Sequence, residues 1–556
     1  MALLVSCGCA ANEVEDILIH TPEGATLSAL VALPDTETPV PAILTFDIYT
    51  NPDAQKSDVA KLAERGYAGV IAYARGKYRS QDPVDPYEHE ARDASAVVDW
   101  IARQPWSNGK VGMIGGSYNG FTAWAAAKYH PRALEAIAVS AAAIPGQGLP
   151  MYNNIFQNSN YAWTFYVTNN KLLDEKMYGD NDRWRPHPRN WFLSGRPYRE
   201  FDAVDGTPNP WFQRWLRHPA FDAYWQSMVP YGKEFARIDI PVLTITGYYD
   251  AAQISALQYF HEHTRWNRKA EHYVAIGPYD HFGSSGSVKP AVLRGYTIDN
   301  AAQLDSQALK LAFMDYALRG EPKPALLADR INFEVMGTNE WRHAPSVAGM
   351  HRTTRRLYFS AGAGDGAMNA LTARSPAAGS SVLLEVDLAD RVEFHGFHAF
   401  PNPIVQGPLE YITESLFESE PFTDVTTISG PFAGELNVTI NKKDFDPTIA
   451  VYEKQADGKL FHLGFAMLRA SFAKDPTRRV LLKPGVATRI RFETTWISKR
   501  LEPGSRLLVL LDTNKNMMAQ VNYGTGRDVS DESVQDAGEP LQIRWNAGSY
   551  LDVPID

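Results

Sequence analysis

A serine lies between two structural signals in the stretch VGMIGGSYNGFTAW, residues 111–124. The apolar run before Gly115 and Gly116 predicts a buried strand, and the alanine-rich stretch after Ser117 predicts a helix. A serine at such a turn presents its hydroxyl at the carboxyl edge of a sheet, with backbone N–H groups of the helix start beside it. The stretch therefore predicts a nucleophile. A glycine-rich phosphate-binding turn is the alternative that this stretch alone leaves open.

A serine is a weak nucleophile unless a base takes its proton and a third group orients that base. Asp250 ends the run PVLTITGYYD, and His281 ends VAIGPYDH, so each follows an apolar strand. Sheets of this kind gather their sites at the carboxyl ends of the strands. Asp280 competes as the acid, but neighbouring residues on an extended chain point apart. Asp250 is therefore the preferred acid, with His281 as the base.

The elements that must position these residues alternate between apolar strands and helices. The runs PVPAILTFDIY, AGVIAYARG and KVGMIGG predict strands, with helical spacing in DVAKLAERGY and DASAVVDWIARQ. A strand hairpin with a turn at residues 22–24 is expected before them. The alternation predicts a parallel sheet with helices, over residues 15–145 and 236–322.

Two further regions differ from this pattern. Residues 146–235 contain 20 aromatic residues and six of the 13 tryptophans in short helical pieces, which predicts an inserted helical cap. Its aromatic side chains either cover a substrate pocket or fill the core of the cap. Residues 323–556 offer short β segments with little helix, as in a β-sandwich or jelly roll.

Composition excludes several classes of function. The 556 residues are 44% hydrophobic and 21% charged, with a formal net charge of −10 and no basic stripe, so nucleic acid is not expected as a partner. The only cysteines, Cys7 and Cys9, lie in a tail of residues 1–14, so no disulfide scaffold, zinc cluster or cysteine nucleophile is expected. No cofactor is expected either. The sequence does not indicate an oligomeric state.

The tail itself suggests a location. The letters before and at Cys7, LVSC, resemble the end of a bacterial lipoprotein signal without its basic start and full apolar segment. A protein lipidated at Cys7 would work outside the cytoplasm. An ordinary N-terminus of a cytoplasmic protein is the alternative.

The motifs together resemble the cocaine esterase / X-Pro dipeptidyl-peptidase family of serine hydrolases, which includes glutaryl-cephalosporin acylases and α-amino acid ester hydrolases. The resemblance covers most of the chain, through ARG at 74–76, DWIARQPWSNGKVGMIGGSYNGF, GYYD, GPYDH, VMGTNEWR and GPFAGELNVTINKKDFDPTIAVYE. The family's elbow resembles G-x-S-Y-x-G, which Asn119 and Gly120 fit. The resemblance implies an α/β-hydrolase domain with an inserted helical cap and a C-terminal jelly roll.

The resemblance also implies roles for single residues. Ser117 matches the nucleophile, Asp250 the acid and His281 the base. The oxyanion hole is expected to combine the backbone N–H of Tyr118 with the hydroxyl of Tyr49. Tyr49 ends the stretch TFDIY, where family members usually read T-R-x-P-Y, so its frame lacks the arginine and the proline.

The expected activity is cleavage of an ester or amide acyl bond through an acyl-enzyme. Related amino-ester hydrolases have carboxylates just after the acid, where this chain reads AAQ at 251–253, so an α-amino substrate is disfavoured. An X-Pro dipeptidyl-peptidase acting on short peptides is the alternative. A ligand-binding protein on a hydrolase scaffold is a remoter one.

Overall fold

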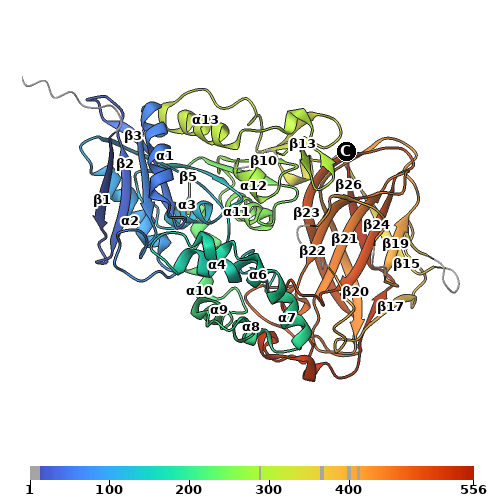
Figure 1. Ribbon diagram of the computed structural model, residues 1–556. Coiled ribbons are helices and arrows are strands. Elements are labelled where there is room, and N and C mark those ends of the chain that lie inside the picture. Colours follow the sequence, from blue (N-terminus) through green and yellow to red (C-terminus); the bar gives the residue numbers. More distant parts are fainter. Residues whose placement is uncertain (1–12, 287–289, 363–367, 397–401, 410–412) are drawn as a thin grey trace, which may run out of the picture.

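A computed structural model describes residues 13–286, 290–362, 368–396, 402–409 and 413–556 (Figure 1). Cys7, on which the lipoprotein expectation rests, lies outside the described residues. Within these ranges, no helix combines the length and apolar character needed to cross a bilayer.

A ten-stranded mixed sheet carries the N-terminal half, in the order β1-β2-β4-β3-β5-β6-β9-β10-β13-β14. The strands from β4 to β13 in this order are parallel to their neighbours, and β1, β2 and β14 pair antiparallel. The expected hairpin is confirmed as β1 and β2. The strands are β1 (Val14–His20), β2 (Thr26–Ala32), β3 (Val40–Asp47), β4 (Ala68–Tyr73), β5 (Ser107–Gly116), β6 (Leu134–Ser140), β9 (Val242–Gly247), β10 (His272–Gly277), β13 (Ile331–Val335) and β14 (Glu340–Ala344).

Helices cover both faces of this sheet because its central strands are apolar on both sides. Helices α1 and α13 bury Leu62 and Phe313 against one face, and α2, α3 and α11 bury Val97, Trp124 and Phe260 against the other. Their bounds are α1 (Pro52–Glu64), α2 (Glu90–Ala102), α3 (Tyr118–Lys128), α11 (Gln253–Trp266) and α13 (Ser306–Arg319).

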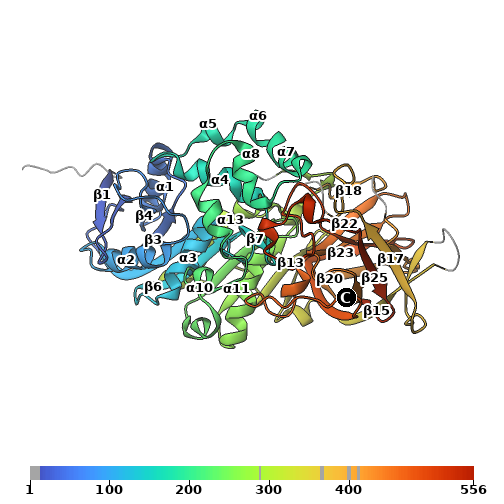
Figure 2. The ribbon, with the colours of Figure 1, turned by 90° about the horizontal axis from the view of Figure 1, so that it is seen from below.

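Short helices fill the chain between β6 and β9. In Figure 1 these teal and green helices extend from the mixed sheet toward the orange and red β domain, and Figure 2 shows them from below. Gly195 and Gly206 end two of them with φ of 65° and 82°, which only glycine adopts readily. They are α4 (Ser159–Thr168), α5 (Glu175–Tyr178), α6 (Asn181–Trp184), α7 (Pro186–Ser194), α8 (Phe201–Asp205), α9 (Pro210–Trp215) and α10 (Ala223–Gln226), after a small hairpin of β7 (Met151–Tyr152) and β8 (Ile155–Phe156).

The aromatic side chains of this insertion pack in two places. Tyr161, Phe201 and Phe212 are buried and pack on one another at 4.8 to 5.9 Å between ring centroids, as a core of the cap. Trp163 instead packs on Tyr118 of the mixed-sheet domain, with 5.5 Å between their ring centroids.

The C-terminal part is a β domain whose strand pairs are antiparallel except for β16 with β19. Buried and exposed residues alternate along several strands, as expected where one face is solvated. Its strands are β15 (Thr353–Ser360), β16 (Asn369–Thr372), β17 (Ser381–Val386), β18 (Val405–Gln406), β19 (Leu416–Ser419), β20 (Thr426–Ile440), β21 (Pro447–Lys454), β22 (Leu460–Met467), β23 (Thr488–Leu501), β24 (Arg506–Thr513), β25 (Leu541–Asn546) and β26 (Tyr550–Ile555).

This architecture confirms the expected fold class: a mixed α/β sheet with a helical insertion, followed by a β domain. One boundary differs from the prediction. The β domain was expected to start at residue 323, but β13 pairs with β10 and β14 pairs with β13, so residues 331–344 extend the first sheet. Their apolar pattern predicts a strand, but it does not tell which sheet the strand joins.

Candidate active site

Ser117 lies on a tight turn between β5 and α3. Its backbone has φ of 57° and ψ of −120°, a strained conformation for a residue with a side chain. A Cβ atom added at Gly115 would lie 2.3 Å from the carbonyl oxygen of Asn119, and one at Gly120 would lie 3.0 Å from the Cβ of Ala142. Close packing against the backbone therefore requires Gly115, and a side chain at Gly120 would have to displace Ala142 by a few tenths of an ångström.

The structure brings the three residues predicted as nucleophile, base and acid together. Nε2 of His281 lies 2.9 Å from Oγ of Ser117, and Nδ1 of His281 lies 2.9 Å from Oδ1 of Asp250. Asp250 is buried, and its carboxylate also accepts hydrogen bonds from the backbone N–H of Ala252 and the hydroxyl of Thr246. These bonds hold the carboxylate toward the imidazole. Nδ1 of His281 is then the protonated nitrogen, and Nε2 accepts from the serine.

The charge of His281 depends on its surroundings. Burial of the ring disfavours its protonated form, but the charge of Asp250 and the hydrogen bond to it, with a contribution from Asp280, outweigh burial. The pKa of His281 is consequently raised above its ordinary value. The side chain is 29% exposed, so solvent reaches it.

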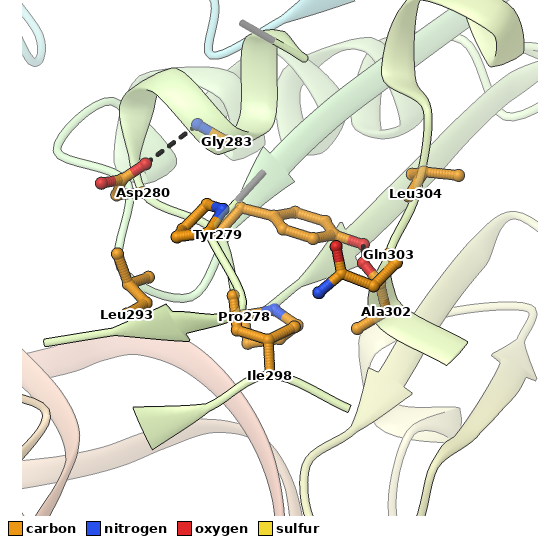
Figure 3. A pocket seen from close by; sticks show the side chains of 10 residues that line it. Pro278, Tyr279, Asp280, Gly283, Leu293, Ile298, Ala302, Gln303 and Leu304 are labelled. Atoms are coloured by element: carbon orange, nitrogen blue, oxygen red, sulfur yellow. Dashed lines mark hydrogen bonds between the residues drawn. The ribbon is translucent and has the colours of Figure 1, made fainter. Parts of the chain in front are cut away.

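Asp280 has a different role from Asp250. Its Oδ1 accepts a hydrogen bond of 2.9 Å from the backbone N–H of Gly283 and thereby caps α12 (His281–Ser285), as the dashed line in Figure 3 shows. Figure 3 also shows the side chain of Tyr279 pointing away from Asp280 toward Ala302, whose carbonyl oxygen accepts a hydrogen bond of 2.7 Å from the Tyr279 hydroxyl.

The small cavity lined by Tyr279, Asp280 and Ala302 has room for about one water molecule. It is too small to hold a substrate.

The two predicted oxyanion donors both lie next to the serine. Tyr118 is the first residue of α3, so its N–H has no acceptor one turn earlier in the helix. The phenol of Tyr49 lies near the Ser117 side chain, which acts to lower the pKa of the phenol, and its oxygen accepts a hydrogen bond of 3.3 Å from Nε1 of Trp163. Burial raises the pKa of Tyr49 to about 12, so its hydroxyl keeps its proton at neutral pH.

Several contacts at this site were not predicted from the sequence. The Tyr118 hydroxyl donates to the buried carboxylate of Glu90 and accepts from the backbone N–H of Tyr87. Trp163 comes from the inserted helix α4, and Gln253 links the loop after Asp250 to the β domain. Each of these contacts joins residues far apart in the chain, so no local sequence signal could identify it.

Cofactor groups are a separate question. Within the described ranges, no cluster of three or more His, Cys, Asp or Glu side chains is arranged to hold a metal ion.

Comparison with known protein families gives two matches that together cover most of the chain. Residues 23–283 match the X-Pro dipeptidyl-peptidase (S15) family, and residues 328–542 match the C-terminal non-catalytic domain of X-Pro dipeptidyl-peptidase. The cocaine esterase of Rhodococcus sp. (strain MB1 Bresler) is 24% identical over 558 residues, which is 94% of each protein.

Solved structures share the whole architecture. An α-amino acid ester hydrolase superposes with a TM-score of 0.78 at 20% identity and covers 100% of this chain and 98% of its own. A CocE/NonD family hydrolase from Staphylococcus aureus gives a TM-score of 0.68 at 16% identity, over 97% and 93% of the two chains. At these identities the likeness establishes the fold.

Proposed function

The chain belongs to the S15 and CocE/NonD family of hydrolases, and on that premise we propose that it cleaves a small ester or amide through an acyl-enzyme on Ser117. The observation that carries the proposal is the hydrogen-bonded series Ser117–His281–Asp250, with 2.9 Å at each step. Such a series activates a serine hydroxyl because the imidazole takes its proton while the carboxylate stabilises the imidazolium.

The reaction follows from these positions. Oγ of Ser117 attacks the substrate carbonyl carbon as its proton passes to Nε2 of His281. The carbonyl oxygen becomes an oxyanion that accepts hydrogen bonds from the N–H of Tyr118 and the hydroxyl of Tyr49. His281 then gives the proton to the leaving oxygen or nitrogen as the acyl bond breaks. A water molecule, deprotonated by His281, releases the acid by the same steps in reverse.

Contacts of the nearby acidic residues favour an ester or amide without a free α-amino group. In the inserted helices, Asp174 and Asp180 cap α5 and α6, and Glu175 accepts a hydrogen bond of 2.9 Å from the hydroxyl of Tyr166. After Asp250, the chain has Gln253, whose amide is bonded to the β domain. An X-Pro dipeptidyl-peptidase needs an anionic anchor for the amino terminus of its peptide, which these engaged groups do not readily supply.

The proposal is tested by a fluorophosphonate probe and a substrate panel. The wild-type protein is expected to bind the probe covalently and to hydrolyse p-nitrophenyl acetate or butyrate faster than glycyl-prolyl-p-nitroanilide. Ser117→Ala is expected to lose both labelling and turnover. Equal labelling of both proteins contradicts the nucleophile, and a folded wild-type protein without any turnover on the panel favours a ligand-binding function. Faster turnover of glycyl-prolyl-p-nitroanilide favours the peptidase.

A further inference from the structure

Asp47 is a buried carboxylate at the end of β3, two residues before Tyr49. Its Oδ1 accepts a hydrogen bond of 2.6 Å from the backbone N–H of Tyr49. The side chain of Asn119, the second residue after Ser117, lies near enough to this carboxylate to lower its pKa. Asp47 thus bonds the loop that carries Tyr49 and lies beside the elbow that carries Tyr118.

Gln55 of α1 fixes the orientation of this carboxylate. Its Nε2 donates to Oδ2 of Asp47 at 2.6 Å and to the carbonyl oxygen of Tyr49 at 3.1 Å. Its Oε1 accepts from the N–H of Asn51 at 2.9 Å and from the hydroxyl of Tyr73 at 2.8 Å. The nitrogen and the oxygen of the amide are therefore both hydrogen-bonded, so a flip of the Gln55 amide would break these bonds.

A second bond joins the same two segments. The hydroxyl of Thr122, in the first turns of α3, donates to the carbonyl oxygen of Phe46 and is also 2.9 Å from the carbonyl oxygen of Asn119. The end of β3 is therefore tied to the elbow helix through its backbone as well as through Asp47. The stretch TFDIY lacks the arginine and proline that frame this tyrosine in the resembling family, and these contacts form a frame in their place.

We propose that Asp47 is a positioning residue, whose carboxylate fixes the Tyr49 hydroxyl and the Tyr118 N–H relative to each other so that both reach one oxyanion. This inference rests on the proposed function, because it concerns the proposed oxyanion hole. Oxyanion stabilisation depends on donors fixed before the reaction, and displacements of about 1 Å cost up to about 100-fold in rate.

The groups that face Asp47 determine when its carboxylate is charged. Burial raises the pKa of Asp47 to about 6. The hydrogen bond from the Tyr49 N–H, the nearby side chain of Asn119 and the charge of Lys77 each lower it, but by less than burial raises it. The carboxylate of Asp58 contributes a smaller increase, and the phenols of Tyr49 and Tyr73 stay neutral at this pH because their own pKa values are raised. Asp47 is therefore ionised at neutral pH and gains a proton near pH 6.

The test compares Asp47→Asn with Asp53→Asn, a change at an exposed acid in the first turn of α1. In Asp47→Asn an amide N–H faces Nε2 of Gln55, so a donor meets a donor. We expect kcat on p-nitrophenyl acetate to fall about 10- to 100-fold with KM within about twofold. Affinity for an aryl trifluoromethyl ketone, which forms a tetrahedral adduct with serine, is expected to fall by the same factor. Asp53→Asn is expected to match the wild type.

The pH profile separates positioning from a structural role. In the wild type, log kcat/KM is expected to fall with a slope of about one where His281 gains its proton, and with a slope approaching two below about pH 6 as Asp47 gains one as well. Asp47→Asn is expected to keep a slope of one. If Asp47→Asn does not fold, Gln55→Met replaces it, with the same fall in kcat and in ketone affinity expected.

The outcomes distinguish this inference from the proposed function. Turnover that persists in Ser117→Ala overturns the function and, with it, this inference. An inactive Ser117→Ala together with an unchanged kcat and an unchanged slope in Asp47→Asn overturns only the role of Asp47. A rise in KM with kcat unchanged also overturns it, because the carboxylate would then serve substrate binding.

Discussion

The side-chain amide of Gln253 exchanges two hydrogen bonds with the backbone of Trp496. Nε2 of Gln253 donates to the carbonyl oxygen of Trp496 at 3.2 Å, and the N–H of Trp496 donates to Oε1 of Gln253 at 2.7 Å. Nε2 also donates to the carbonyl oxygen of Gly247, at the end of β9. Gln253 begins α11, three residues after Asp250, so β23 of the β domain is bonded directly to the segment that carries the acid.

Gln253→Ala is expected to destabilise the protein, because it leaves two buried backbone groups of Trp496 without partners. Each unmade buried bond costs about 1–3 kcal/mol, so the free energy of unfolding is expected to fall by roughly 2–6 kcal/mol. Urea unfolding followed by tryptophan fluorescence measures this. Gln258→Ala, on the same helix, is the matched control, because the side chain of Gln258 makes no hydrogen bond within the described part of the chain. An equal effect of the two changes would show that the Gln253–Trp496 contact adds no stability.

Asp250→Asn is expected to slow turnover and to move the acidic limb of its pH profile. The wild-type limb should lie above pH 6.5, because Asp250 raises the pKa of His281 and only the neutral ring accepts the serine proton. Without the carboxylate of Asp250, burial of the ring lowers this pKa against only the smaller opposing effect of Asp280, so the limb should move to lower pH. The amide also favours the wrong tautomer of the ring, which costs about 10³- to 10⁴-fold in kcat. Measurement of kcat/KM from pH 5 to 9 checks both effects, and a limb that stays in place argues against Asp250 as the partner of His281.

Tyr49→Phe is expected to lower kcat by about 100-fold or more with little change in KM, because it removes one oxyanion donor. Trp163→Phe tests the indole that donates to the Tyr49 oxygen, since it keeps an aromatic ring at a buried position but removes the N–H. A smaller loss, about 3- to 10-fold in kcat, is expected there, because the hydroxyl remains but loses one restraint on its direction. The double variant should be no slower than Tyr49→Phe alone. Additive losses would mean that Trp163 acts on the substrate independently of Tyr49.

The sequence was informative where a signal is local. Ser117, Asp250 and His281 each follow an apolar strand, and parallel strands bring their carboxyl ends to one edge, so their meeting was predictable. Contacts between elements that lie far apart in the chain could not be predicted in this way. Trp163 reaches Tyr49, and Gln253 reaches Trp496, only after the insertion and the β domain have packed.

The partner of a strand is likewise not predictable from its own sequence. The run INFEVMG is apolar and of strand length, and it stands among other β segments of the C-terminal region, so its assignment to the β domain was the simplest reading. In the structure it pairs instead with β10, from Val274 opposite Ile331 to Ile276 opposite Phe333. Periodicity describes one strand and not its neighbour.

Glu334 of β13 lies fully buried, and neither of its carboxyl oxygens receives a hydrogen bond from a donor in the described residues. Burial, together with the nearby carboxylate of Asp299, raises the pKa of Glu334 to about 9. The carboxyl is therefore protonated in the folded protein at pH 8, whereas an unfolded chain ionises near pH 4.5. A folded pKa above the unfolded one gives stability that is complete below about pH 4.5 and is lost as pH rises toward 9.

Glu334→Gln is consequently expected to stabilise the protein at alkaline pH, since the amide needs no proton and its N–H₂ can donate to Asp299. The gain in the free energy of unfolding should be roughly 2–4 kcal/mol at pH 8 and should shrink toward pH 5, where the wild-type penalty is small. Glu340→Gln, at an exposed position at the start of β14, is the control and should show no such trend. Urea unfolding of the three proteins at pH 5, 6.5 and 8 measures the difference. A Glu334→Gln variant that is less stable than the wild type at pH 8, or that gains equally at all three pH values, would mean that Glu334 is ionised in the folded protein.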